Sequence, residues 1–254
     1  MRVVLLTQDE PLFLAPSIDY LLSRKPDGIE VVGCIVFDPS PLGKKFGMAA
    51  RAKELLRVFG AVYFMRYAAR FALARTRPSR RLANILRRHG IPELRLTANV
   101  NDPPSLDAIR ALYPDMLVSV AGNQIFRRAL IELAPKGCLN LHTALLPKYR
   151  GLMPTFWALK NGEKETGVSV FLVDEGIDSG PIVVQKRVPI DTDSLEELIR
   201  RTKVIGMDAV WEAVERIRCG NVELIPNPDA EKSYFSFPTN ADVRAFRAAG
   251  KRLY

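Results

Sequence analysis

The sequence is poor in the residues that build metal centres and disulfide frameworks. It has only three cysteines and two histidines among 254 residues, and no CxxC pair. They are scattered along the chain, at Cys34, Cys138, Cys219, His89 and His142. Because none of these positions has metal-ligand spacing, we expect no metal site, no structural zinc and no disulfide framework.

Long apolar runs are missing as well. No stretch of about 18 uninterrupted apolar residues occurs, which excludes a conventional membrane span. The N-terminus opens as a strand, Arg2 to Thr7, instead of a basic stretch before an apolar core, so we expect no secretory signal and a cytoplasmic location. With 48% hydrophobic and 26% charged residues the composition is that of a soluble globular protein, and we treat residues 1–254 as a single domain.

Acidic residues are almost absent from one segment, about residues 41–90. It holds thirteen basic residues and one acid, Glu54, whereas the whole chain has a net charge of +9. Aromatic residues are interleaved with the arginines. This basic insertion is consistent with one or two helices that pack on the sheet with solvated arginines. A helix at an anionic membrane surface, on the inner face, and a binding region for an anionic substrate are the alternatives.

Short apolar runs alternate with helical stretches over most of the chain. We predict strands at 2–7, 30–37, 94–97, 115–120 and 138–141, and helices at 17–24, 104–112 and 126–133. Alternation of this kind predicts an α/β fold. The expected architecture is a doubly wound, mostly parallel Rossmann-like sheet with helices on both faces and a basic helical insertion.

The pattern changes after Thr166. Two extended runs at 167–173 and 182–190 are joined by a Gly- and Asp-rich connection and look like a hairpin or neighbouring strands. Ser194, with Glu197 three residues later, has the spacing of a capping box and predicts a long helix to about Arg218. In the short C-terminal extension, about 191–254, we further expect a strand at 234–237 and a helix at 241–248.

Two polar residues that suit acyl transfer lie at the end of the strand predicted at 138–141. Asn140 and His142 are two residues apart, so on an extended backbone their side chains point to one face. An amide that donates to a carbonyl oxygen, beside a base, suits acyl transfer to a nucleophile. Asp178, on a second loop, can orient or support the imidazole.

Two longer motifs surround these residues and carry a resemblance to a family. Gly137-Cys-Leu-Asn-Leu-His-Thr-Ala-Leu-Leu-Pro-Lys-Tyr-Arg-Gly151 is followed by Asp174-Glu-Gly-Ile-Asp-Ser-Gly-Pro181. At this spacing the sequence resembles the folate-dependent formyltransferases, which include glycinamide ribonucleotide, methionyl-tRNA and nucleotide-sugar enzymes. The resemblance is strong over residues 94–190 and weak in the first strand.

The resemblance implies a co-substrate, 10-formyltetrahydrofolate, and a role for each matching residue. Asn140 would bind the formyl oxygen, His142 would act in proton transfer, and Asp178 would hold His142 or relay the amine proton. The folate would lie against two loops, Gly122, Asn123, Gln124, Ile125 and Phe126 in one and Val173, Asp174, Glu175, Gly176 and Ile177 in the other. The acceptor would meet Gln8, Asp9, Glu10, Lys148, Arg150 and Gly151.

Three positions depart from the family pattern. Phe171 stands where many members have a histidine, and Thr143-Ala144 replaces the usual Pro-Ser after the catalytic histidine. The loop after the first strand carries Asp9 and Glu10 instead of the glycine-rich phosphate cradle of the glycinamide ribonucleotide enzyme. Two carboxylates there would repel a phosphate, which argues against that substrate.

These features favour formyl transfer to the primary amine of an amino sugar, nucleotide-linked or lipid-linked. A methionyl-tRNA formyltransferase-like enzyme without the additional C-terminal barrel is the alternative. A non-catalytic relative that binds a membrane or nucleic acid through the basic insertion is another. Hydrolysis of the formyl-folate itself is a third, and a homodimer through the C-terminal strands or the insertion fits any of them.

Overall fold

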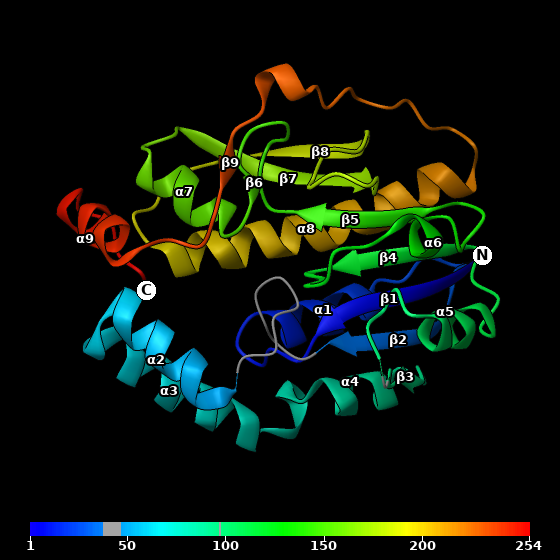
Figure 1. Ribbon diagram of the computed structural model, residues 1–254, viewed down its shortest axis with the longest axis horizontal. Coiled ribbons are helices and arrows are strands. Elements are labelled where there is room, and N and C mark those ends of the chain that lie inside the picture. Colours follow the sequence, from blue (N-terminus) through cyan, green and yellow to red (C-terminus); the bar gives the residue numbers. More distant parts are fainter. Residues whose placement is uncertain (38–46, 97) are drawn as a thin grey trace.

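The structure is a computed structural model that describes residues 1–37, 47–96 and 98–254. Its centre is a seven-stranded sheet of order β3-β2-β1-β4-β5-β7-β8 (Figure 1). The first five strands in this order are parallel, whereas β7 and β8 are antiparallel to their neighbours. The strands are β1 (Arg2–Gln8), β2 (Glu30–Phe37), β3 (Glu93–Leu94), β4 (Met116–Val120), β5 (Cys138–His142), β7 (Glu165–Leu172) and β8 (Ile182–Pro189).

Helices cover both faces of the sheet, as expected for a Rossmann-like fold. One face packs against α1 (Leu14–Ser23), α4 (Leu82–Arg88) and the long α8 (Leu195–Arg218). The other packs against α5 (Pro103–Arg110) and α6 (Arg128–Ile131). The predicted fold class is therefore confirmed.

The long helix α8 begins where the sequence predicts. The Ser194 hydroxyl accepts a hydrogen bond from the Glu197 backbone N–H at 3.3 Å, which caps the helix. The reciprocal half of the capping box is absent, because the Glu197 carboxylate binds the Thr192 hydroxyl at 2.6 Å. Thr192 in turn accepts from the Ser194 backbone N–H, so three residues share the capping role.

Two predicted elements are shorter than the sequence suggests. The strand expected at 94–97 is the two-residue β3, and Thr97 lies outside the described residues. The helix expected at 126–133 is the single turn α6. Asn101 shortens it, because its side chain donates to Ile125 O and accepts from Arg127 N, both at 2.8 Å, which holds the preceding residues as a loop.

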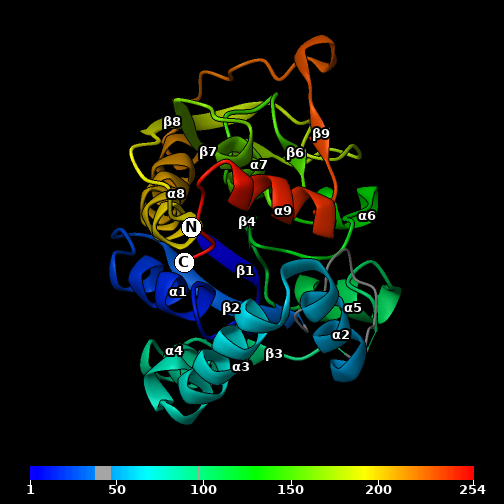
Figure 2. The same cartoon turned by 90° about the vertical axis from the view of Figure 1, so that its left-hand side faces the viewer.

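The basic insertion forms helices α2 (Met48–Phe59) and α3 (Ala61–Thr76), a 3₁₀ turn η2 (Pro78–Arg80) and α4. Lys44 and Lys45 lie outside the described residues. Only α4 packs in the helical layer on the sheet. The expectation that the insertion packs on the sheet is corrected for α2, which packs against the C-terminal helix α9 (Asn240–Ala248), as Figure 2 shows.

Several arginines of the insertion are also engaged with protein groups and not left to solvent. They bind Glu196, Asp19, Asp9 and the backbone carbonyls of Pro11 and Leu12, through Arg70, Arg88, Arg75 and Arg80 respectively. The expectation of solvated arginines is thus corrected in part. No helix in the described part of the chain is long and apolar enough to cross a membrane. The cytoplasmic location, the membrane contact and the homodimer stay predictions.

The chain after α8 returns across the molecule and covers the segment that follows β5. Its strand β9 (Tyr234–Phe235) pairs with β6 (Arg150–Gly151). Between β6 and β7 the short helix α7 (Pro154–Lys160) buries Trp157, whose indole N–H donates to Ser236 O at 3.0 Å. A 3₁₀ turn η3 (Asp229–Glu231) precedes β9. The C-terminal extension therefore packs on the part of the chain where the candidate site lies.

Candidate functional site

The sheet has its switch point between β1 and β4, where the strand order reverses direction. In open α/β sheets the ligand crevice lies outside the carboxyl ends of the strands at this point. Here the amide of Gln8, at the end of β1, donates to the carbonyl of Ala121, just after β4. Gln8, expected to contact substrate, thus joins the two sides of the switch point.

Asn140 and His142 lie on β5, directly beside the switch point. Leu139 and Leu141 alternate with them and pack in the cluster that includes α8, so Asn140 and His142 face the opposite side. Asn140 is half-buried, and its side-chain amide makes no hydrogen bond to any residue that the structure describes. A positioned amide without a protein partner is available to a ligand.

His142 is held between a carbonyl and a carboxylate. Its Nε2 lies 2.7 Å from Tyr149 O, and its Nδ1 lies 3.6 Å from Asp178 Oδ2. Because a carbonyl can only accept, Nε2 donates to Tyr149, and Nδ1 is the nitrogen that faces the carboxylate of Asp178. The ring is 7% exposed, so protein groups and not bulk water surround this pair.

Asp178 reaches His142 from the loop between β7 and β8. Its Oδ2 also accepts a hydrogen bond from the Gly151 backbone N–H at 2.8 Å. Gly151 has φ +95°, and a Cβ there would stand 2.3 Å from Phe235 O, so the close approach of β6 and β9 requires glycine. The structure therefore brings His142, Asp178 and Gly151 together from three separate segments.

The loop that carries Asp178 has a backbone path that the sequence alone does not reveal. Asp178 itself has φ +50°, which is uncommon for a residue with a side chain. A Cβ on Gly180 would stand 1.8 Å from Leu172 O, so the loop folds tightly over the end of β7. Asn227, which the sequence analysis did not single out, donates hydrogen bonds to the carbonyls of Asp178 and Gly180.

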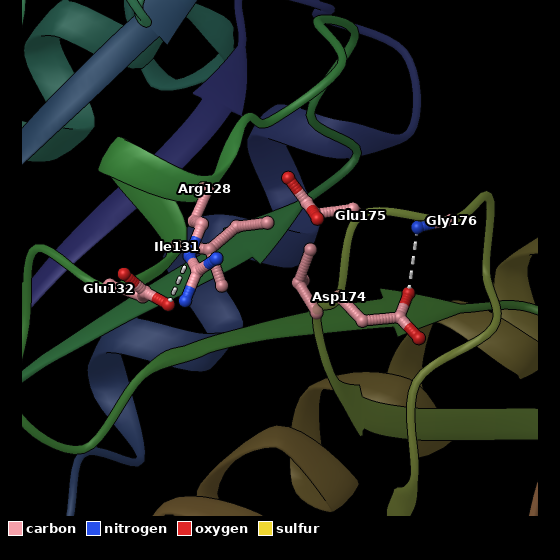
Figure 3. Close-up of a pocket in the computed structure, with 7 residues that line it drawn as sticks. Arg128, Ile131, Glu132, Asp174, Glu175 and Gly176 are labelled. Carbon is pink, nitrogen blue, oxygen red and sulfur yellow. Dashed lines mark hydrogen bonds and ion pairs between the residues drawn. The ribbon is translucent and has the colours of Figure 1, made fainter.

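A cavity of about 430 Å³ lies between α6 and the loop that follows β7 (Figure 3). Four of its lining residues belong to the expected folate loop, namely Val173, Asp174, Glu175 and Gly176. The other three are Arg128, Ile131 and Glu132 on α6. Asn140, His142 and Asp178 do not line this cavity.

The loop after β4, the other expected folate contact, is fixed by hydrogen bonds. The Gln124 carboxamide oxygen accepts from Val100 N at 3.0 Å, and the Ile125 carbonyl accepts from Asn101. Phe126 packs into the core, whereas the Ile125 side chain is 59% exposed. Asn123 is buried, and Gly122 sits so close to Ser119 that a Cβ would meet its hydroxyl at 2.5 Å.

The remaining expected substrate contacts divide into free and engaged side chains. Lys148 is exposed. Glu10 accepts hydrogen bonds from the backbone N–H groups of Leu12, Phe13 and Leu14 at 2.8 to 2.9 Å, so its carboxylate occupies the N-terminus of α1. Asp9 lies 3.8 Å from Arg75.

Arg150 is 3% exposed and bound to protein through both terminal nitrogens. Its guanidinium donates to Asp229 at 2.7 Å, and this bond holds the pKa of the Asp229 carboxyl below its usual value. A second terminal nitrogen donates to Asn227. The Arg150 guanidinium thus faces the C-terminal extension, whereas the backbone N–H of the next residue, Gly151, binds the Asp178 carboxylate.

The departures from the family pattern have local structural explanations. Phe171 is 2% exposed and packs with Leu146 and Ile182, so it has a packing role. Thr143 accepts a hydrogen bond from the Thr155 hydroxyl at 3.3 Å, which ties β5 to α7. Cys138 is buried, and burial raises the pKa of its thiol. No group of three metal-ligating side chains occurs within the described ranges.

The fold and these residues define an α/β protein whose polar site lies beside the switch point of a Rossmann-like sheet. A family model described as formyl transferase matches residues 1–214. The chain belongs to the formyl transferase family.

Curated relatives are methionyl-tRNA formyltransferases. The protein from Kosmotoga olearia is 37% identical over 160 residues, which cover 63% of this chain and 51% of that protein. The protein from a Synechococcus strain is 33% identical over 235 residues, which cover 92% of this chain and 63% of that protein. The chain thus spans between half and two thirds of the length of these relatives.

Solved structures share the fold at lower identity. A sugar N-formyltransferase from a Shewanella species has a TM-score of 0.59 at 19% identity, covering 93% of this chain and 77% of that one. Glycinamide ribonucleotide transformylase 1 from Symbiobacterium toebii has a TM-score of 0.61 at 20% identity, covering 89% of this chain and 94% of that one.

Proposed function

We propose that this protein transfers a formyl group from 10-formyltetrahydrofolate to a primary amine. The observation that carries the proposal is the arrangement around β5. Asn140, whose amide has no hydrogen-bond partner among the described residues, shares a strand face with His142, whose Nδ1 faces the carboxylate of Asp178. Membership of the formyl transferase family supports the same reaction.

The residues around the cavity fit the proposed co-substrate. A volume of about 430 Å³ lies within the range of small-molecule sites. Two exposed carboxylates in its lining, Asp174 and Glu175, offer hydrogen-bond acceptors to a polar heterocycle. Bound there, the folate would supply the formyl group that is transferred.

Each of the three residues then has a defined task. The Asn140 amide donates to the formyl oxygen, on which negative charge grows as the amine nitrogen bonds to the formyl carbon. His142 accepts the amine proton at Nδ1, and Asp178 stabilises the imidazolium that results. The bond between the formyl carbon and the folate nitrogen breaks, and that nitrogen takes up the proton that the His142 imidazolium gives back.

The acceptor that the relatives favour is methionyl-tRNA. Relatives at 33% to 37% identity carry that activity in their names, whereas likeness to the sugar enzyme, at 19% identity, supports the fold alone. The basic insertion is also compatible with a polyanionic acceptor, because its thirteen basic residues far outnumber its one acid and only some of them pair with carboxylates elsewhere in the chain. An amino-sugar acceptor stays a prediction.

The two histidines offer a matched test of the catalytic proposal. We expect His142→Asn to lower kcat by about 10² to 10⁴-fold, the usual contribution of a positioned proton-transfer group. His89→Asn, which removes a histidine bound to Asp19 on the far helix layer, serves as the control. Equal activity of the two variants in a 10-formyltetrahydrofolate turnover assay would contradict the role of His142.

The acceptor is tested with purified protein, 10-formyltetrahydrofolate and two acceptor sets, initiator methionyl-tRNA and a panel of nucleotide-linked amino sugars. Product is read by mass spectrometry. Formylated methionyl-tRNA, with a KM that rises steeply with salt, is the expected result. Formylation of a sugar amine alone would overturn the tRNA proposal and support the amino-sugar prediction.

A further inference from the structure

Asn227, in the C-terminal extension, binds the loop of Asp178 through hydrogen bonds of its side chain. This residue lies beyond residues 1–214 matched by the family model. Its segment is held in place by a pair of backbone hydrogen bonds between Ile225 and Ile182, at 2.8 and 3.0 Å. Asn227 therefore approaches the site from a part of the chain that the family pattern does not cover.

The Asn227 side chain bridges two turns of the catalytic loop. Its Nδ2 donates to Asp178 O and to Gly180 O, both at 2.9 Å. The first of these carbonyls belongs to Asp178, the residue whose side chain faces His142, and the second belongs to Gly180, two residues later. Because both amide hydrogens are used on one loop, the contact fixes the direction of its backbone as well as its distance.

Arg150 fixes the orientation of the Asn227 amide. One terminal nitrogen of Arg150 donates to both Asn227 Oδ1, at 2.9 Å, and Asn227 O, at 3.0 Å. A guanidinium can only donate, so Oδ1 must face it and Nδ2 must face the loop. Arg150 is 3% exposed and its other terminal nitrogen binds Asp229, so it cannot swing freely.

The loop needs such support because its backbone is unfavourable on its own. Asp178 has φ +50°, a region that residues with a Cβ visit rarely, and residues 174–177 are exposed. Among the described residues, the Asp178 carboxylate itself faces His142 and accepts a hydrogen bond from the Gly151 N–H, whereas Asn227 binds the backbone of the loop. Displacement of the loop would therefore separate Asp178 from His142.

We propose that Asn227, held by Arg150, is a positioning residue that keeps the Asp178 carboxylate against His142. The proposal deepens the proposed function and rests on it for the catalytic consequence, although the positioning itself is a structural relation that can be observed without turnover. Asn227 touches neither the cavity nor His142, so it acts through Asp178.

The kinetic test compares Asn227→Ala with Asn221→Ala, an exposed asparagine of the same segment. We expect Asn227→Ala to lower kcat by about 10-fold to 100-fold, the range for small misplacements of a reacting group, with little change in either KM. Asn221→Ala should match the wild type. Wild-type kcat in Asn227→Ala would overturn the proposal.

A double-variant cycle separates positioning from a general loss of structure. If Asn227 acts through Asp178, Asn227→Ala should lower kcat little further in an Asp178→Asn background. If the two substitutions lower kcat by independent factors, so that the double variant shows the product of both, the proposal is overturned. Absence of activity in the wild type with every acceptor would instead count against the proposed function.

A readout without turnover keeps the inference testable in that case. The amide proton of Gly151 donates to Asp178 Oδ2 and so reports where the carboxylate lies. In ¹⁵N-labelled protein, Asn227→Ala should move the Gly151 amide resonance in the same direction as Asp178→Ala, and Asn221→Ala should leave it unchanged. An unmoved Gly151 resonance in Asn227→Ala would overturn the inference whatever the activity.

Discussion

The carboxylate of Glu10 offers the most direct test of how this structure departs from its sequence pattern. From the sequence, Glu10 belongs to the loop that meets the acceptor. In the structure its two oxygens accept hydrogen bonds from three successive backbone N–H groups at the start of α1. No other side chain caps this helix, since Phe13 at the N-cap position makes no such bond. We therefore expect Glu10 to stabilise the fold.

Replacement of Glu10 by alanine leaves those backbone donors without a protein partner. Loss of an N-cap costs about 0.5 to 2 kcal/mol, and bonds to a charged acceptor lie at the upper end, so we expect Glu10→Ala to lower the unfolding free energy by about 2 kcal/mol. For a domain of this size that corresponds to a fall in Tm of about 4 to 8 °C. Glu10→Gln keeps a side-chain acceptor, so its free energy of unfolding should lie between those of the wild type and Glu10→Ala.

The control is the neighbouring carboxylate. Asp9 is 39% exposed and only loosely paired with Arg75, so Asp9→Ala should change the unfolding free energy by about 0.5 kcal/mol or less. Urea titration monitored by circular dichroism gives the free energies, and turnover gives KM. A Glu10→Ala protein as stable as Asp9→Ala, but with a raised KM for the acceptor, would refute this reasoning and restore the substrate role.

Two further predictions concern the contacts that hold the insertion and the C-terminal extension. Hydrogen bonds from Arg70 lower the pKa of Glu196 to about 2, so this contact stabilises the fold above the usual carboxyl pKa and is lost as pH falls towards 2. Glu196→Gln should lower the free energy of unfolding by about 1 kcal/mol at pH 7. In urea titrations at several pH values, this difference from the wild type should vanish near pH 2. A difference that persists at that pH contradicts the assignment. Gly151→Ala should cost about 2 to 3 kcal/mol, because its Cβ would strike Phe235 O, whereas Gly162→Ala, also at positive φ but in open space, should show the backbone strain alone in the same titrations. If the two variants lose the same free energy of unfolding, the structure relieves the contact between the new Cβ at position 151 and Phe235 O.

Local patterns in the sequence were enough to predict most strands of the sheet and to place Asn140 and His142 together. Alternation along β5 places Asn140 and His142 on one face whatever the rest of the chain does, because successive side chains of a strand point to opposite sides. The cap at Ser194 likewise depends on a residue three positions away. The start of α6 was predicted too early, since Asn101 holds the loop before α6 from another part of the chain.

From the sequence alone follow the residue types of the site, the strand that carries two of them and the mostly parallel pairing of the sheet. The contact between Asp178 and His142 and the contact between Asn227 and the loop of Asp178 are visible only in the folded chain, because their partners are far apart in sequence. Asn227 lies 49 residues from Asp178, and a hydrogen bond between them depends on how strand β8 and helix α8 pack, which no local pattern encodes. The Glu10 contact spans at most four residues, but the sequence does not say whether that carboxylate turns to the helix or to a ligand.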